Sequence, residues 1–157
     1  MKSVIIGMGN PLLTDDGVGA SVVRQIEETL RKRIDVDCLE LYTGGIRLME
    51  AMVGYDRAYV VDAMVTGEHE PGTVHSFSPT EFITTKNTVS SHDTDLSTAL
   101  EMGKLLGMKL PDEVKIWGVE AREVETFGEE LTEGVAAAVP QVVEHILQDL
   151  NISDRRG

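Results

Sequence analysis

The sequence has little cysteine, few basic residues and no long apolar run. Cys38 is the only cysteine among 157 residues, so one chain can form neither a disulfide nor a thiolate metal cluster, which suits a reducing compartment. No stretch approaches the ~20 apolar residues of a membrane span, and the N-terminus lacks the apolar run and cleavage site of a signal peptide. We therefore expect a cytoplasmic protein without membrane association. The apolar run around Cys38 predicts a buried side chain, not a nucleophile.

Basic residues are scarce relative to acidic ones. The chain has 14 Lys and Arg against 27 Asp and Glu, which gives a formal net charge of −13. Such a surface repels phosphate backbones and anionic lipid. Nucleic acid is therefore excluded as an expected ligand, whereas a cation or a partner with a basic segment is compatible with the charge.

The apolar pattern predicts strands and helices in alternation. The expected strands are Lys2–Met8, Ile34–Leu41, Arg57–Asp62, Thr73–Phe77 and Val114–Val119. The expected helices are Val18–Leu30, Ile46–Met52, Thr94–Leu106 and Thr132–Leu150. Leu106 should face inward from the third helix, and Pro140 should kink the last helix or mark its start.

This alternation indicates one α/β domain over residues 1–150. We expect a mostly parallel, twisted sheet of about five strands with helices on both faces. The length is that of one compact domain with a core of its own. Residues 151–157 should form a frayed tail.

Several polar residues follow the predicted strands, where ligands bind in folds of this class. These residues are Asn10, Asp15, Asp16, Glu40, Thr43, Asp62, His92 and Glu120. Carboxylates and an imidazole gathered from distant segments are the donors that a hard or borderline cation needs. Each also has a structural explanation. Asp15 or Asp16 could cap the first helix, Asp62 could bind loop amides, and His92 could belong to a polar loop.

The order of motifs resembles the hydrogenase maturation proteases. The matching segments are Gly7-x-Gly9-Asn10-x-Leu12-x-x-Asp15-Asp16-Gly17-x-Gly19, Thr43-Gly44-Gly45, Val60-Val61-Asp62-Ala63, Ser91-His92 and Gly118-Val119-Glu120. The resemblance implies an endopeptidase that removes a C-terminal extension from a nickel–iron hydrogenase large-subunit precursor after nickel insertion. It also implies that Asp16, Asp62 and His92 bind the metal. The family's aspartate-rich loop after the second strand is poorly matched, because Glu40 and Thr43 stand there.

The implied metal site has a physical rationale. Two carboxylates and one imidazole leave coordination positions open for a substrate group, and nickel tolerates mixed nitrogen and oxygen donors. A carboxylate that does not bind the metal can act as a general base, so Asp16 and Asp62 are also the candidate catalytic residues. The resemblance implies that nickel arrives with the substrate, and no organic cofactor is expected.

Two other functions fit parts of the sequence. The Gly-x-Gly-Asn-Pro opening also resembles peptidyl-tRNA hydrolase, but that family needs an early catalytic histidine and a basic surface. The first histidine here is His69, and an acidic domain binds RNA poorly. A non-enzymatic nucleotide-binding module could use glycines before a helix to bind phosphate. Asp15 and Asp16 would repel an anion at that helix start.

Overall fold

The computed structural model describes residues 1–81 and 95–156, with side chains up to residue 151. Within this part, five strands form one sheet: β1 (Ser3–Met8), β2 (Val36–Leu41), β3 (Arg57–Met64), β4 (Val74–Phe77) and β5 (Glu113–Glu120). Their order is β2-β1-β3-β5-β4. Neighbouring strands are parallel except β4, which pairs antiparallel with β5. The predicted five-stranded, mostly parallel sheet is confirmed.

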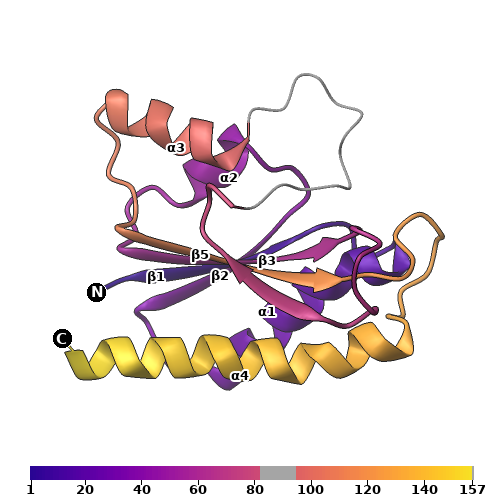
Figure 1. Ribbon diagram of the computed structural model, residues 1–157. Coiled ribbons are helices and arrows are strands. Elements are labelled where there is room, and N and C mark those ends of the chain that lie inside the picture. The colour runs from indigo at the N-terminus through magenta and orange to yellow at the C-terminus, as the bar shows by residue number, and fades with distance from the viewer. Residues whose placement is uncertain (82–94, 157) are drawn as a thin grey trace.

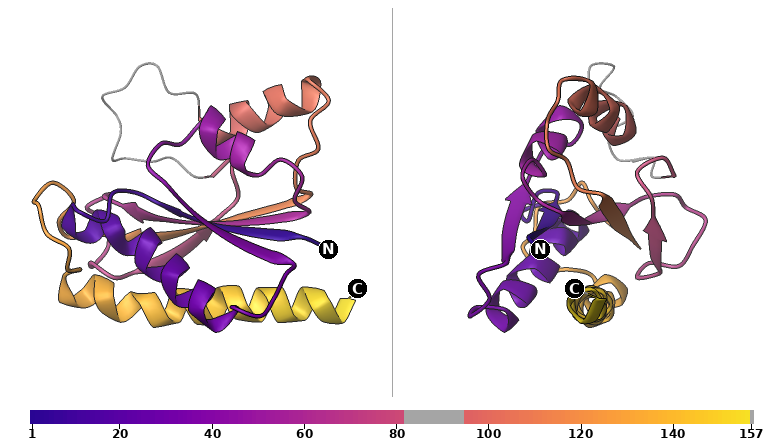
Figure 2. Two further views of the ribbon diagram at one scale, coloured as in Figure 1. Left: turned by 180° about the vertical axis from the view of Figure 1, so that it is seen from behind. Right: turned by 90° about the vertical axis from the view of Figure 1, so that its left-hand side faces the viewer.

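Helices cover both faces of the sheet (Figures 1 and 2). The helices α1 (Val18–Thr29) and α4 (Glu133–Arg156) lie on one face, and α2 (Ile46–Ala51) and α3 (Leu96–Leu105) lie on the other. A short 3-10 helix, η1 (Thr14–Gly17), precedes α1. None of the helices in the described ranges is both long and apolar enough to cross a membrane.

The strand alternation divides the core into two layers. Along β1, Ile5 faces α1 and α4, whereas Val4 and Ile6 face α2 and α3. All three side chains are fully buried, as expected for a central parallel strand with helices on both faces. The sheet is therefore a rigid support for the loops that follow its strands.

Two details of β3 and α3 differ from the sequence-based expectations. β3 continues past Asp62 to Met64, because Asp62, Ala63 and Met64 pair with β5. The inward position predicted for Leu106 is wrong, since α3 ends at Leu105 and Leu106 is 71% exposed.

The last helix also departs from its predicted bounds. Pro140 lies inside α4 and does not mark its start. Residues 151–156, expected to be a frayed tail, continue the helix to Arg156. Buried Val139 and Val142 pack against the core on either side of Pro140, and such tertiary packing supplies most of a helix's stability in proteins.

Close contact between α1 and the sheet depends on glycine. A Cβ atom on Gly19 would lie 2.6 Å from the backbone oxygens of Met8 and Val61. On the strand side, a Cβ on Gly7 would collide with the backbone oxygen of Gly19. The two glycines let the start of α1 lie directly on β1 and β3, and this contact fixes η1 beside the carboxyl end of β3.

Candidate functional site

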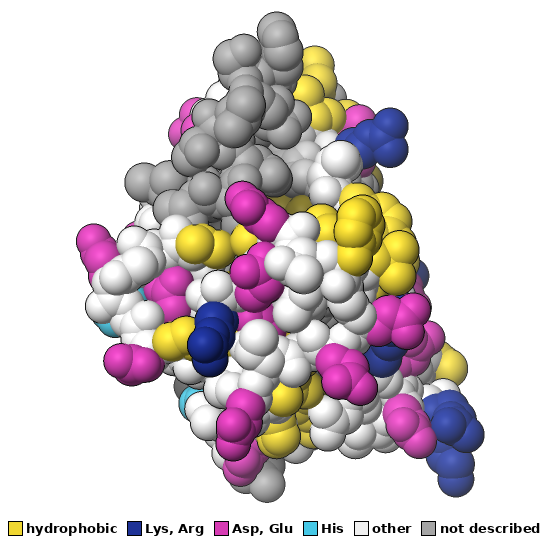
Figure 3. Space-filling view, turned by 90° about the vertical axis from the view of Figure 1, so that its right-hand side faces the viewer, with side chains coloured by type: hydrophobic (Ala, Val, Ile, Leu, Met, Phe, Trp, Pro, Cys, Tyr) yellow, Lys and Arg dark blue, Asp and Glu magenta, His cyan; other side chains and the backbone are white. Residues whose placement is uncertain are grey.

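A cleft of about 210 Å³ opens at the carboxyl edge of the sheet. Its walls come from four separate segments, and the lining residues are Met8, Gly9, Leu13, Asp16, Tyr42, Asp62, Val124 and Glu125. The structure thus places Asp16 and Asp62, which are far apart in the sequence, in one cleft. Figure 3 views this edge, where acidic side chains are spread over the face and few basic ones are seen.

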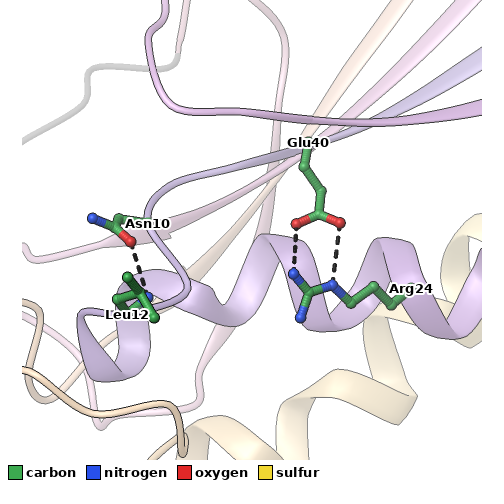
Figure 4. Close-up of polar contacts among 4 residues, drawn as sticks. All are labelled: Asn10, Leu12, Arg24 and Glu40. Carbon is green, nitrogen blue, oxygen red and sulfur yellow. Dashed lines mark hydrogen bonds and ion pairs between the residues drawn. The ribbon is translucent and has the colours of Figure 1, made fainter.

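Asp16 is held by the loop that follows β1. Its Oδ2 accepts a hydrogen bond from the backbone N–H of Asn10 at 2.8 Å. Gly9 has φ 112°, and a Cβ there would collide with the backbone oxygen of Asp16, so this position requires glycine. Asn10 in turn accepts a hydrogen bond from the N–H of Leu12 at 2.9 Å (Figure 4). The loop therefore fixes the partly buried Asp16 carboxylate against the end of β1.

Asp62 is a buried carboxylate inside a central strand. Its side chain is on β3, and the residue is 6% exposed. Its Oδ1 accepts a hydrogen bond from the N–H of Ala63 at 2.9 Å. Gly7 pairs with Val61, so β1 ends beside Asp62. Asp62 thus lines the cleft beside the end of β1.

The charged residues that line the cleft are all acidic. Asp16 and Asp62 come from the sheet side, and the exposed Glu125 comes from the loop after β5. Carboxylates in a partly enclosed site attract cations and repel anions. Carboxylate oxygens are also suitable metal donors, so the cleft can bind a positively charged group.

Asp15 has a different role from its neighbour. Its carboxylate is fully buried and accepts hydrogen bonds from the N–H groups of Arg122, Glu123 and Thr132 at 2.7–3.0 Å. The Thr132 hydroxyl donates to the same carboxylate. The alternative that Asp15 caps the first helix therefore does not describe this carboxylate. Asp15 joins the segment before α1 to the loop between β5 and α4.

The capping alternative does not describe Asp16 either. Asp16 lies within η1, and its carboxylate accepts a hydrogen bond from the N–H of Asn10, which precedes that helix. Leu13 and Gly17 occupy the N-cap positions of η1 and α1 and make no side-chain cap hydrogen bond.

The loop between β5 and α4 forms a wall of the cleft that the sequence did not indicate. Backbone bonds join it to the first loop, including Thr14 N–H to Gly128 O at 2.8 Å. The Glu123 carboxylate accepts the N–H groups of Glu125 and Thr126, and these bonds lower the pKa of Glu123. The turn closed by these two hydrogen bonds includes Val124 and Glu125. No periodicity or motif in the segment marks them as cleft residues.

Two other acids considered from the sequence are engaged elsewhere. Glu40 forms a two-bond ion pair with Arg24 of α1 at 3.0–3.1 Å (Figure 4). Glu120 is buried and accepts hydrogen bonds from the N–H and hydroxyl groups of Thr66. Both therefore stabilise the fold, and neither lines the cleft.

The third predicted ligand, His92, lies outside the described residues. Within the described ranges, no group of three or more His, Cys, Asp and Glu side chains has an arrangement that could hold a metal ion. Asp16 and Asp62 provide two carboxylate donors in the cleft. Their role as metal ligands, and that of His92, stays a prediction.

Comparisons with known proteins agree on one family. The family model described as hydrogenase maturation protease matches residues 20–149. The hydrogenase 2 maturation protease of Escherichia coli (strain K12) is 28% identical over 155 residues, which cover 98% of this chain and 93% of the relative.

Solved structures give the same result. The hydrogenase maturating endopeptidase HybD from E. coli has a TM-score of 0.77 at 28% identity, covering 98% of this chain and 94% of that chain. The [NiFe] hydrogenase maturation protease HybD from Thermococcus kodakarensis has a TM-score of 0.66 at 28% identity, covering 96% and 99%. Sequence and fold are thus similar over nearly the full length of these proteins. The chain therefore belongs to the hydrogenase maturation protease family.

Proposed function

We propose that this endopeptidase removes a C-terminal extension from the precursor of a nickel–iron hydrogenase large subunit after nickel insertion. The observation that carries the proposal is the cleft of about 210 Å³ that both Asp16 and Asp62 line. In a chain of this family, two carboxylates from distant segments at the carboxyl edge of the sheet are the groups best placed to act on the precursor.

Nickel is part of the substrate in this proposal. Asp16 and Asp62 suit such a centre, because each presents a carboxylate held by a backbone N–H group and nickel accepts oxygen donors. His92 is the proposed nitrogen donor. The bound metal would place the adjacent peptide in the cleft and supply Lewis acidity to its carbonyl.

The chain's own groups then have distinct tasks. The anchored carboxylates orient the precursor end, which lowers the entropic part of the barrier to cleavage. A carboxylate oxygen of Asp16 or Asp62 that does not hold the metal acts as general base: it takes a proton from the water that attacks the scissile carbonyl, and the proton passes to the leaving amine nitrogen of the extension. Met8, Leu13 and Val124 line the same cleft and limit the access of bulk water.

The other functions are not favoured. The family match argues against a peptidyl-tRNA hydrolase and against a nucleotide-binding module. The acidic lining of the cleft would also repel the phosphates that both alternatives require. The cytoplasm is the proposed location, because the unpaired Cys38 suits a reducing compartment.

The test is incubation of the purified chain with a nickel-loaded large-subunit precursor, followed by mass spectrometry of the precursor's C-terminus. The proposal predicts two products, the mature subunit and one intact released extension. A precursor that keeps its full mass after incubation with folded enzyme would contradict the proposed function.

A further inference from the structure

The outer edge of β2 has backbone groups available for another strand. β2 lies at one end of the sheet order, and among residues 1–81 and 95–156 it pairs only with β1. In the right-hand view of Figure 2, it is the outermost strand on one side. An open edge of this kind is a template for an added chain unless it is covered or blocked.

The direction of each backbone group in β2 follows from two hydrogen bonds. Ser3 N–H donates to Asp35 O at 2.9 Å, and Gly9 N–H donates to Leu41 O at 3.0 Å. Residues of odd number in this stretch therefore point toward β1. Because backbone groups alternate along a strand, the N–H and C=O groups of Val36, Cys38 and Glu40 point away from the sheet. Within the described residues, no backbone group from another segment forms a hydrogen bond with these three residues on that outer side.

A groove runs beside this edge. It has a volume of about 350 Å³ and includes Val36, Cys38 and Leu39 in its floor. Leu30 of the turn after α1 lines one side, and Tyr55 lines the other. Leu30 packs against the core under α1 and α4, whereas Tyr55 packs against the core under α2 and α3. The groove thus has walls on both faces of the sheet, as an added strand with alternating side chains needs.

The groove lies along β2, and the cleft begins at Tyr42, the residue that follows β2. Leu39 lines the groove and Tyr42 lines the cleft, and three residues of strand span about 10 Å. A chain that leaves the cleft at Tyr42 can therefore enter the groove directly. The charges that line the groove balance in sign, because Glu27 and Asp37 stand against Arg31 and Arg33. Arg33 also pairs with Asp35, and Asp37 pairs with Lys2. Recognition in the groove consequently relies on the backbone of the occupant more than on its charge.

We propose that the C-terminal extension of the precursor binds along β2 as an added antiparallel strand while the scissile bond lies in the cleft. This proposal rests on the proposed function. The extension is the part of the precursor beyond the scissile bond, so it passes from the cleft toward Val36 and runs against the direction of β2. Backbone pairing would hold extensions of different sequence, because it needs only N–H and C=O groups.

Amide hydrogen exchange measured by NMR tests this pairing residue by residue. The probe is a synthetic peptide that contains the extension and the scissile bond of the precursor used in the cleavage assay. The peptide carries no nickel, so it should stay uncut during the measurement. We expect exchange at the N–H groups of Cys38 and Glu40 to slow about tenfold or more on binding. The N–H groups of Leu39 and Leu41 point to β1 and serve as internal controls without change.

A second arm uses peptides with N-methyl groups. Methylation removes one backbone donor, so it should weaken binding about tenfold at every second residue of the extension and little at the residues between. Unchanged exchange at Cys38 and Glu40 with saturating peptide would overturn the proposal, as would a loss of binding without this alternation. Slow exchange without peptide that depends on protein concentration would also overturn it, because the edge would then pair with a second copy.

The two proposals fail in different ways. Cleavage of the nickel-loaded precursor with no protection of β2 leaves the proposed function intact and removes the added strand. Alternating protection of β2 by the peptide, with no cleavage of the precursor, supports the added strand and contradicts the proposed function.

Discussion

Asp15 and Asp16 are adjacent residues with different partners. The Asp15 carboxylate is buried among backbone N–H groups of the loop after β5, whereas Asp16 lines the cleft. At the residue scale, the two neighbours thus have different roles: Asp15 stabilises the fold, whereas Asp16 can contact the substrate. Substitutions at the two positions should therefore produce different losses.

Asp15→Asn should destabilise the protein by about 2–4 kcal/mol, because an amide nitrogen would face N–H donors and leave buried groups without a partner. Urea unfolding measures the change. Asp16→Asn is the matched control, and its free energy of unfolding should fall by less than about 1 kcal/mol, since the amide oxygen can still accept the Asn10 N–H. Equal unfolding midpoints for the two variants would contradict the assigned role of Asp15.

Asp62→Asn should lower the rate of precursor cleavage about 100-fold or more, because it removes a charged donor and a candidate general base. The fold should persist, since the side-chain oxygen can still accept the Ala63 N–H. Glu40→Gln is the control: this acid pairs with Arg24 and lies outside the cleft. It should keep wild-type cleavage and cost less than about 1 kcal/mol of stability. A fully active Asp62→Asn enzyme would remove Asp62 from the site.

Cys38 gives a prediction about pH. Burial, followed by nearby Glu27 and Asp37, raises the pKa of its thiol from 9.0 to about 11. The folded state therefore favours the neutral thiol. The raised pKa stabilises the folded state fully below about pH 9, and this stabilisation is lost as the pH rises through the pKa of the folded state. Labelling with a disulfide reagent at pH 8 should be slow in the native protein and fast in urea. Rapid native labelling would contradict this environment.

At the scale of elements, the contact between α1 and the sheet sets the position of η1. Gly19→Ala would place a Cβ 2.6 Å from the oxygens of Met8 and Val61 and displace α1. We expect a loss of about 1–3 kcal/mol, together with slower cleavage because Asp16 moves with the helix start. Gly44→Ala is the control, since its nearest contact would be the Met8 side chain at 3.8 Å. Thermal unfolding and cleavage rates are measured for both variants. A Gly19→Ala protein with wild-type stability and wild-type cleavage would argue against the close contact.

The elements themselves were largely predictable from the sequence. β-branched runs predicted the central strands, and apolar residues at helical spacing predicted α1 and α4. The positions of Asp16 and Asp62 at one edge followed from the rule that parallel strands end together. The role of Asp15 in joining two loops was not predictable, because it depends on bonds to Arg122, Glu123 and Thr132, more than 100 residues away. Glu125 was missed for the same reason: tertiary bonds place its loop.

At the scale of the molecule, we propose that this acidic enzyme contacts its partner through one edge of the sheet. The net charge of −13 and the acidic cleft favour an approach by a cationic group. The rest of the chain is a two-layered support whose core holds the loops of that edge in place. We therefore propose that selectivity comes from the precursor's nickel centre, recognised by a few carboxylates on a rigid sheet.

The most direct measurement compares nickel-loaded and nickel-free forms of the same precursor. Both are incubated with wild-type enzyme, and the released extension is quantified by mass spectrometry over time. We expect release from the nickel-loaded form and an intact nickel-free form even with excess enzyme, because Asp16, Asp62 and His92 are the proposed ligands that recognise the metal. Equal release from both forms would contradict this expectation and favour an acid–base peptidase that uses Asp16 or Asp62 without nickel.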